Sequence, residues 1–384
     1  MTILRGMAWD HPRGVGALRA VSAEYSRRRP DVSLVWYARS LRDFEDASIA
    51  ELAASFDLVA LDHPFMGQVH EQEALIPLER VLPKSVLADR EAASTGPSFA
   101  SYRWAQSQWA LPIDAAAQVS AYRWDLLADR GAGQSEPRTW DEMYAVLKEL
   151  GPERVILPAN STHLLCSLLT LCAQQAGDDF WFGPGGVEES VGVPALARLT
   201  ELLALAAPES LTTDPIQALE SMSRDDRFVC APLVFGYITY ARADRPVGFR
   251  PVPSADGSAR VGLLGGVGLG ISARSRDVGE AAAFLDFVTG EDCQRRLFTE
   301  AGGQPAHRGA WTDPAVNVQC GDFLRDTLPA LDSAFVRPRH AWYPLVHQRA
   351  GSELHRLVRQ GAGPRDAVRR FNEICAAIYR DGPA

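Results

Sequence analysis

The segment from Gly265 to Gly303 constrains the fold of this chain more than any other stretch. It reads GGVGLGISARSRDVGEAAAFLDFVTGEDCQRRLFTEAGG and is followed directly by Gln304 and Pro305. The pattern predicts a glycine-rich strand, a basic turn, an amphipathic helix, an acidic break, a second short helix and a tight turn, in that order. Because glycine has no Cβ, such a strand favours a place where another part of the backbone comes close.

The length and composition indicate an ordinary globular protein with two domains or lobes. The chain has 384 residues, of which 46% are hydrophobic and 23% charged, and a single core rarely grows beyond about 250–300 residues. The net charge is −9. An acidic chain argues against a nucleic-acid partner, because a phosphate backbone is bound by basic surfaces.

The first third of the chain alternates strands and helices. The apolar pattern predicts the elements 3–9 (strand), 15–28 (helix), 32–36 (strand), 44–55 (helix) and 56–61 (strand). This alternation favours a parallel sheet with helices on both faces. Ligands bind at the carboxyl ends of such strands, so the loops 9–14, 37–41 and 62–67 become candidate ligand-binding loops.

Four segments in a fixed order resemble type 1 extracellular solute-binding proteins, the ligand-capturing partners of ABC importers. They are FDLVALD (56–62), LIPLERVL (75–82), the stretch from WALPI to RTWDEM (109–143) and the glycine-rich segment with its continuation (265–310). The resemblance covers most of the chain. A nucleotide-binding loop is disfavoured, because the glycines follow the order GGxGxG rather than GxGxxG and no GKS or GKT follows.

The resemblance implies an α/β fold of the type II periplasmic-binding-protein class. Each lobe would be a mostly parallel sheet flanked by helices, with a hinge and a cleft between the lobes. Lobe 1 is predicted to comprise 1–112 plus 265–310, and lobe 2 to comprise 113–264 plus 311–384. The glycines from 265 to 270 would lie near a crossing between the lobes.

Candidate ligand-binding residues follow from the strand ends and from the crossover. Small-molecule sites combine aromatic faces with a few polar groups, and the candidates are Trp9, Asp10, His11, Arg13, Arg39, Asp62, His63, Asp114, Tyr237, Tyr240, Arg339 and Gln348. Each has a plainer interpretation: Trp9 as core, Asp62 as a helix cap, and the charged groups as solvated loops. The arginines favour an anionic ligand and the aromatic rings favour a sugar or a heteroaromatic ring, and the sequence leaves both open.

The predicted function is a binding protein that closes two lobes on a small polar solute, either of the ABC-importer type or a cytoplasmic derivative of it. Its partners would be the solute and, if exported, an ABC permease; we expect a monomer without membrane insertion. No signal-peptide pattern is visible at Met1. The expectation is therefore cytoplasmic for the sequence as it stands, and periplasmic for a processed or truncated start.

The alternative is a cytoplasmic enzyme on the same fold, similar to the thiaminase I family, with a cysteine nucleophile. Cys230 is the candidate, with Asp62 or His63 as its base. The plainer interpretation is that all six cysteines are buried free thiols, because no CxxC pair or zinc-ligand spacing occurs. Neither a metal nor a cofactor is predicted.

Overall fold

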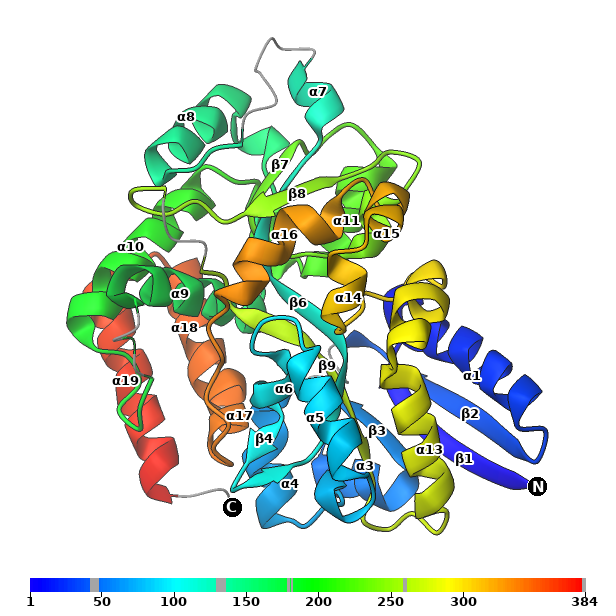
Figure 1. Cartoon of the computed structure of the whole chain (residues 1–384). Helices are drawn as coiled ribbons and strands as arrows, with labels where there is room; N and C mark the ends of the chain where they lie inside the picture. The colour runs from blue at the N-terminus through cyan, green and yellow to red at the C-terminus, as the bar shows by residue number, and fades with distance from the viewer. Residues whose placement is uncertain (42–47, 129–135, 178–179, 181, 258–260, 382–384) are drawn as a thin grey trace.

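The computed structural model describes residues 1–41, 48–128, 136–177, 180, 182–257 and 261–381. Two groups of helices and strands are joined by two long strands, β6 (Leu111–Tyr122) and β9 (Leu264–Ile271), which run from one group into the other (Figure 1). We call the group around the N-terminal strands the first lobe and the other the second lobe. The lobe boundaries at 112/113, 264/265 and 310/311 stay a prediction.

One sheet connects both lobes, in the strand order β2-β1-β3-β9-β6-β7, with β8 also paired to β6. The remaining strands of this sheet are β1 (Thr2–Trp9), β2 (Val32–Arg39), β3 (Leu58–Leu61), β7 (Cys230–Phe235) and β8 (Gly248–Pro251). A separate short hairpin consists of β4 (Arg103–Trp104) and β5 (Ser107–Gln108).

The predicted parallel arrangement holds for the N-terminal strands only. β1 pairs in parallel with β2 and with β3. The described ladders of β6 with β7, β8 and β9 are all antiparallel, and parallel contacts in the second lobe are isolated bridges such as Val155 with Cys230. The difference arises because β6 and β9 cross between the lobes in opposite directions and β7 and β8 add to β6.

Gly266 explains why the crossing strand β9 is rich in glycine. Its φ is +112°, a conformation that side chains rarely adopt, and a Cβ at this position would lie 2.4 Å from the carbonyl oxygen of Asp114 on β6. The two strands therefore approach here at backbone distance. A register shift between Pro112 and Asp114 marks the same place.

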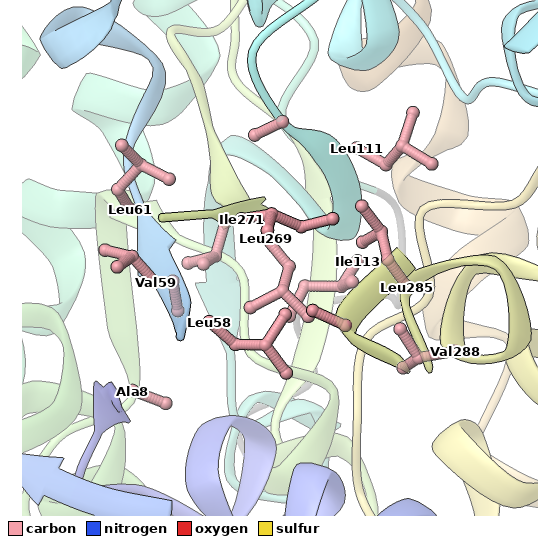
Figure 2. Close-up of a cluster of buried hydrophobic side chains, with 14 of the residues drawn as sticks. Ala8, Leu58, Val59, Leu61, Leu111, Ile113, Leu269, Ile271, Leu285 and Val288 are labelled. Atoms are coloured by element: carbon pink, nitrogen blue, oxygen red, sulfur yellow. The ribbon is translucent and has the colours of Figure 1, made fainter. Parts of the chain in front are cut away.

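Helices cover both faces of the sheet in the first lobe. They are α1 (Ala17–Arg28), α3 (Ile49–Ser55), α4 (Met66–Glu71), α5 (Lys84–Ala92), α6 (Ser98–Ser101) and α13 (Val278–Thr289), with the short helical turns η1 (Pro12–Gly16), η2 (His63–Phe65), η3 (Leu78–Arg80) and η7 (Cys293–Phe298). Residues 44–47 of the predicted helix 44–55 lie outside the described residues. Figure 2 shows the core between sheet and helix, where Leu58 and Leu269 of the strands lie near Leu285 of α13.

The second lobe is mainly helical. Its helices are α7 (Trp124–Ala128), α8 (Trp140–Leu150), α9 (Ser161–Ala176), α10 (Glu189–Ala204), α11 (Pro215–Arg224), α12 (Ile238–Ala241), α14 (Arg308–Trp311), α15 (Pro314–Gln319), α16 (Phe323–Asp332), α17 (Tyr343–Leu345), α18 (Ser352–Arg359) and α19 (Pro364–Asp381), with the turns η4 (Pro152–Arg154), η6 (Pro208–Thr212) and η8 (Val346–Gly351). A capping box begins α8, because the side chains of Thr139 and Glu142 each bond the other's backbone N–H. Among the described helices, none is both long and apolar enough to cross a membrane.

Candidate ligand-binding site

A cavity lies where β6 and β9 cross from one lobe to the other. It contains about 610 Å³ of unfilled space, part of it open to solvent. We call it the central cavity, and its lining residues are Trp9, Arg13, Leu41, Asp62, Asp114, Ala116, Thr162, His163, Cys166, Pro215, Phe235, Tyr237, Gly265, Gly266, Val267 and Arg337. Both lobes contribute side chains, so a molecule held here would touch the two lobes at once.

Trp9 reaches the cavity because it is the last residue of β1. Its side chain is buried, and a Cβ on Gly14 would lie 2.5 Å from the indole ring. The turn η1 therefore packs its backbone against the indole at a distance that only glycine allows. This packing holds the indole ring in one orientation at the cavity wall.

Arg13 and Asp114 form a buried ion pair in the cavity wall. The Arg13 Nε donates to Asp114 Oδ2 at 2.7 Å and its Nη2 to Oδ1 at 2.5 Å. The Arg13 Nη1 donates to the carbonyl oxygen of Gly236 at 2.9 Å, and the guanidinium lies 4.2 Å from the centre of the Tyr237 ring. Burial opposes the charge of Arg13, but Asp114 outweighs it and raises the pKa of Arg13. All three guanidinium nitrogens are therefore occupied, and they tie the first lobe to the loop after β7.

A second ion pair joins Asp62, at the end of β3, to Arg337. The Arg337 Nη2 donates to Asp62 Oδ2, while Asp62 Oδ1 accepts from the backbone N–H of His63 at 2.7 Å. Burial opposes ionisation of Asp62, yet Arg337 and His63 hold the pKa of its carboxyl well below the usual range. The Arg337 side chain is 7% exposed, and its Nε is buried with no hydrogen-bond partner among the described residues.

The N-terminus of α9 forms the part of the wall next to Arg337. Asn160 caps this helix by accepting from the backbone N–H of His163 at 3.0 Å, and its Oδ1 also lies 2.8 Å from His163 Nδ1. Burial, with a smaller contribution from the charge of Arg337, lowers the pKa of His163 to about 3. The imidazole is therefore uncharged at neutral pH and offers a hydrogen-bonding group without a net charge.

Two further hollows adjoin the central cavity. The larger, which we call the polar hollow, is lined by Leu41, Asn160, Ser161, Thr162, His163, Leu211, Thr212, Asp214, Gln217, His347, Gln348, Ser352, His355 and Arg359. The smaller, which we call the side hollow, is lined by Asp62, Pro64, Phe65, Thr162, Arg337, Pro344 and His347. Thr162 lines all three spaces, so they meet at the start of α9.

The structure brings six of the predicted site residues to these spaces. Five line the central cavity and the sixth lies at the polar hollow: Trp9, Arg13, Asp62, Asp114, Tyr237 and Gln348. His11 and Tyr240 do not line these spaces, but the rings of both pack against Tyr237, which does. The His11 ring packs edge-on against Tyr237 at 5.1 Å, and burial, followed by the charge of Arg13, lowers the pKa of His11 to about 4.

Four of the predicted site residues do not line any of these three spaces. His63 is fully buried behind Asp62. Arg339 donates to the backbone oxygens of Ala100 and Arg103, both at 2.7 Å. Asp10 is exposed and Arg39 is half-buried, and neither lines any of the three spaces.

The structure contradicts the prediction that Cys230 acts as a nucleophile. It lies fully buried in β7 and does not line the central cavity. Burial raises the pKa of the Cys230 thiol, whereas a nucleophilic cysteine needs a lowered pKa. The interpretation of the cysteines as buried free thiols is confirmed for all six.

Several lining residues were not in the predicted set, notably His163, Cys166 and Phe235. Arg337 also lines the cavity; in the sequence it belongs to a polar-aromatic cluster with Arg339 and Gln348 that could close over a ligand, but only the latter two were in the predicted set. A signal for His163 exists, because Asn160 is a good helix cap and helix N-termini often face ligands. Phe235 and Cys166 carry no such signal, since an aromatic strand end and a helical thiol are ordinary core residues.

The arrangement is suited to binding a small molecule with both apolar faces and hydroxyl groups. Trp9, Phe235 and Tyr237 offer flat aromatic surfaces, while the charged lining residues of the central cavity form two internal pairs. Within the described part of the chain, no group of three or more His, Cys, Asp or Glu side chains could hold a metal ion.

Comparisons with known proteins agree with this geometry. A family model described as bacterial extracellular solute-binding protein matches residues 45–317. A "Probable amino-acid ABC transporter periplasmic-binding protein" of Sinorhizobium fredii is 26% identical over 215 residues, which cover 52% of this chain and 48% of that protein, about half its length. A "Probable ABC transporter-binding protein" of Deinococcus radiodurans is 24% identical over 294 residues, covering 71% of this chain and 69% of that protein.

Solved structures share the architecture over nearly the whole chain. Maltose-bound MalE3 of T. maritima superposes with a TM-score of 0.83 at 21% identity, covering 98% of this chain and 99% of that one. A solute-binding protein of Agrobacterium radiobacter in complex with ribitol has a TM-score of 0.82 at 19% identity, covering 98% of each chain. At such identities the likeness shows the fold, and it confirms the predicted two-lobed class.

Proposed function

We propose that this chain, which belongs to the family of bacterial extracellular solute-binding proteins, captures a small, hydroxyl-bearing solute in the central cavity between its two lobes. The solute would stack on Trp9 and Phe235 and accept or donate hydrogen bonds at the polar groups between them. Contacts with both lobes would stabilise the closed state over the open one. The chain would then deliver the solute to an ABC permease.

The observation that carries this proposal is the combination of aromatic faces and internally paired charges in one cavity. Trp9 comes from the first lobe, and Phe235 and Tyr237 come from the second. Aromatic faces suit the C–H surface of a sugar ring, and paired carboxylates and guanidinium groups suit its hydroxyls. Maltose and ribitol in two of the structural neighbours support a sugar or a polyol as the solute class.

The oligomeric state is a separate part of the proposal. Both lobes of the chain contribute side chains to the central cavity, which supports capture of the solute within a single copy. We therefore propose that the chain acts as a monomer towards its solute, and sedimentation with and without ligand would test this.

Calorimetric titration and thermal denaturation with a panel of sugars and polyols test the function. We expect at least one compound to raise the melting temperature through preferential binding to the folded state and to be recovered unchanged. A compound recovered in altered form would contradict the proposal and indicate an enzyme.

Phe235→Ala is the first variant to make, because this ring lines the cavity and is not fully buried. Loss of a stacking face is expected to weaken binding roughly tenfold, about 1.4 kcal/mol. Tyr379→Ala is the matched control, since Tyr379 on α19 is 52% exposed and far from the cavity lining. Equal affinity of the Phe235 variant and the control variant would argue against the central cavity as the site.

A further inference from the structure

The point where the three spaces meet has a distinct chemistry. Thr162 lines the central cavity, the polar hollow and the side hollow. Arg337 lines the central cavity and the side hollow. His347 lines the polar hollow and the side hollow. We call Thr162, Arg337 and the first turn of α9 the donor corner.

Arg337 has hydrogen-bond donors to spare, and in this it differs from Arg13. The recorded bonds of Arg337 use only Nη2, which donates to Asp62 and, at 3.4 Å, to the carbonyl oxygen of Leu264. Its Nε is buried without a partner, and no described group accepts from its Nη1. A guanidinium that is more than nine-tenths buried normally has its N–H groups satisfied. Because the Nε is fully buried, Nη1 is the donor of Arg337 that remains for a molecule in the cavity.

The first turn of α9 supplies further donors at the same place. The first N–H groups of a helix have no partner inside the helix, and Asn160 takes up only that of His163. The described residues provide no acceptor for the N–H of Ser161 or of Thr162, nor a partner for the Thr162 hydroxyl. With 16 residues, α9 is long enough for its dipole to favour negative charge at this end.

The charged side chains that line the spaces around the corner balance one another. Asp62 pairs with Arg337, and the polar hollow adds Asp214 and Arg359, one charge of each sign. His163 and His347 are uncharged at neutral pH, because burial first and then the charge of Arg337 lower the pKa of each to about 3. A carboxylate would therefore meet no net negative charge from these side chains.

We propose that the donor corner binds a carboxylate of the solute, so that the chain captures an acidic sugar or a comparable polyhydroxy acid. The Nη1 of Arg337, which no described group uses, can donate a charge-assisted hydrogen bond to one oxygen of a carboxylate, and the N–H and hydroxyl of Thr162 complete the set of donors. The hydroxyl-bearing remainder of the solute extends into the central cavity. The inference rests on the proposed function and adds the acidic group to it.

Matched pairs of compounds test the inference, with titration calorimetry at pH 7.5 and constant ionic strength. The pairs are D-glucuronate with D-glucose, D-galacturonate with D-galactose, and D-gluconate with D-glucitol. We expect the acid of at least one pair to bind at least tenfold more tightly than its neutral counterpart. Glucose 6-phosphate, with nearly two negative charges, is expected to bind less tightly than that acid.

Two variants locate the preference at the donor corner. Arg337→Lys keeps a positive charge opposite Asp62 but removes the Nη1 donor, and Thr162→Val removes the hydroxyl with little change in shape. Each is expected to weaken binding of the acid at least threefold more than binding of its neutral counterpart. Arg349→Gln is the control for an exposed arginine close in sequence, and it should leave the preference unchanged.

Three results would overturn the inference. The first is equal binding of acid and neutral compound in every pair, which leaves the proposed function intact. The second is an acid preference that survives both substitutions, and the third is tighter binding of the phosphate ester than of every carboxylate. A protein that binds none of the compounds, nor any member of the sugar and polyol panel, contradicts the proposed function as well.

Discussion

At the residue scale, the central cavity depends on charged side chains that are paired inside the protein. Arg13 and Asp114 have side chains that are 4% and 0% exposed, and removal of one partner of such a pair leaves a buried charge without compensation. We expect Arg13→Met to lower the free energy of unfolding by about 3–5 kcal/mol. Chemical denaturation followed by circular dichroism measures this.

The surface pair of Arg356 and Glu353 is the matched control. Arg356 also donates two hydrogen bonds to a single carboxylate, at 2.7 and 2.9 Å, but its side chain is 50% exposed. Arg356→Met should therefore change the stability by less than about 1 kcal/mol. The double variant with Arg13→Met and Asp114→Leu should regain most of the loss, and a double variant as unstable as the single one would contradict the argument from the unpaired charge.

At the element scale, β9 can cross between the lobes only because of its glycines. Gly266→Ala would place a Cβ 2.4 Å from the Asp114 oxygen at a φ of +112°, and strain of this kind costs about 1–3 kcal/mol before any displacement of β6. Gly279→Ala, in the first turn of α13, is the control, since nothing lies within 4 Å of its Cβ and alanine favours a helix. We expect a lower melting temperature for the first variant and an unchanged or higher one for the second. Equal melting temperatures would contradict the crossing argument.

The same elements show how far the sequence reaches. The strand ends at Trp9 and Asp62 could be placed from periodicity, because a run of apolar residues followed by polar ones locates the carboxyl end of a strand. The directions of β7 and β8 could not, since parallel and antiparallel strands have the same two-residue period. Arg337 reaches the cavity only through docking of distant segments, which no local pattern encodes, whereas His163 had a local signal in the helix cap at Asn160.

At the scale of the whole molecule, four histidines make folding sensitive to acid: His11, His63 and His163 are buried, and His347 is half-buried. Burial is the main cause that lowers the pKa of His11 and His63 to about 4 and that of His163 and His347 to about 3. An unfolded histidine has a pKa of about 6.5. Between about pH 6.5 and pH 4 the unfolded chain therefore binds more protons than the folded one, so the stability is full above pH 6.5 and falls as the pH falls through this window.

Each such histidine can contribute a slope of up to about 1.4 kcal/mol per pH unit, and the slopes add where the windows overlap. Denaturant midpoints at pH 7.5, 6.5, 5.5 and 4.5 measure the total, and we expect a steady decrease below pH 6.5. His163→Gln should reduce the slope by about one proton. The carboxylate of Asp62, held ionised by Arg337, loses its contribution only below about pH 4, so its effect falls outside the histidine window. A midpoint that stays constant from pH 7.5 to 5.5 would show that these imidazoles become protonated without unfolding the lobes around them.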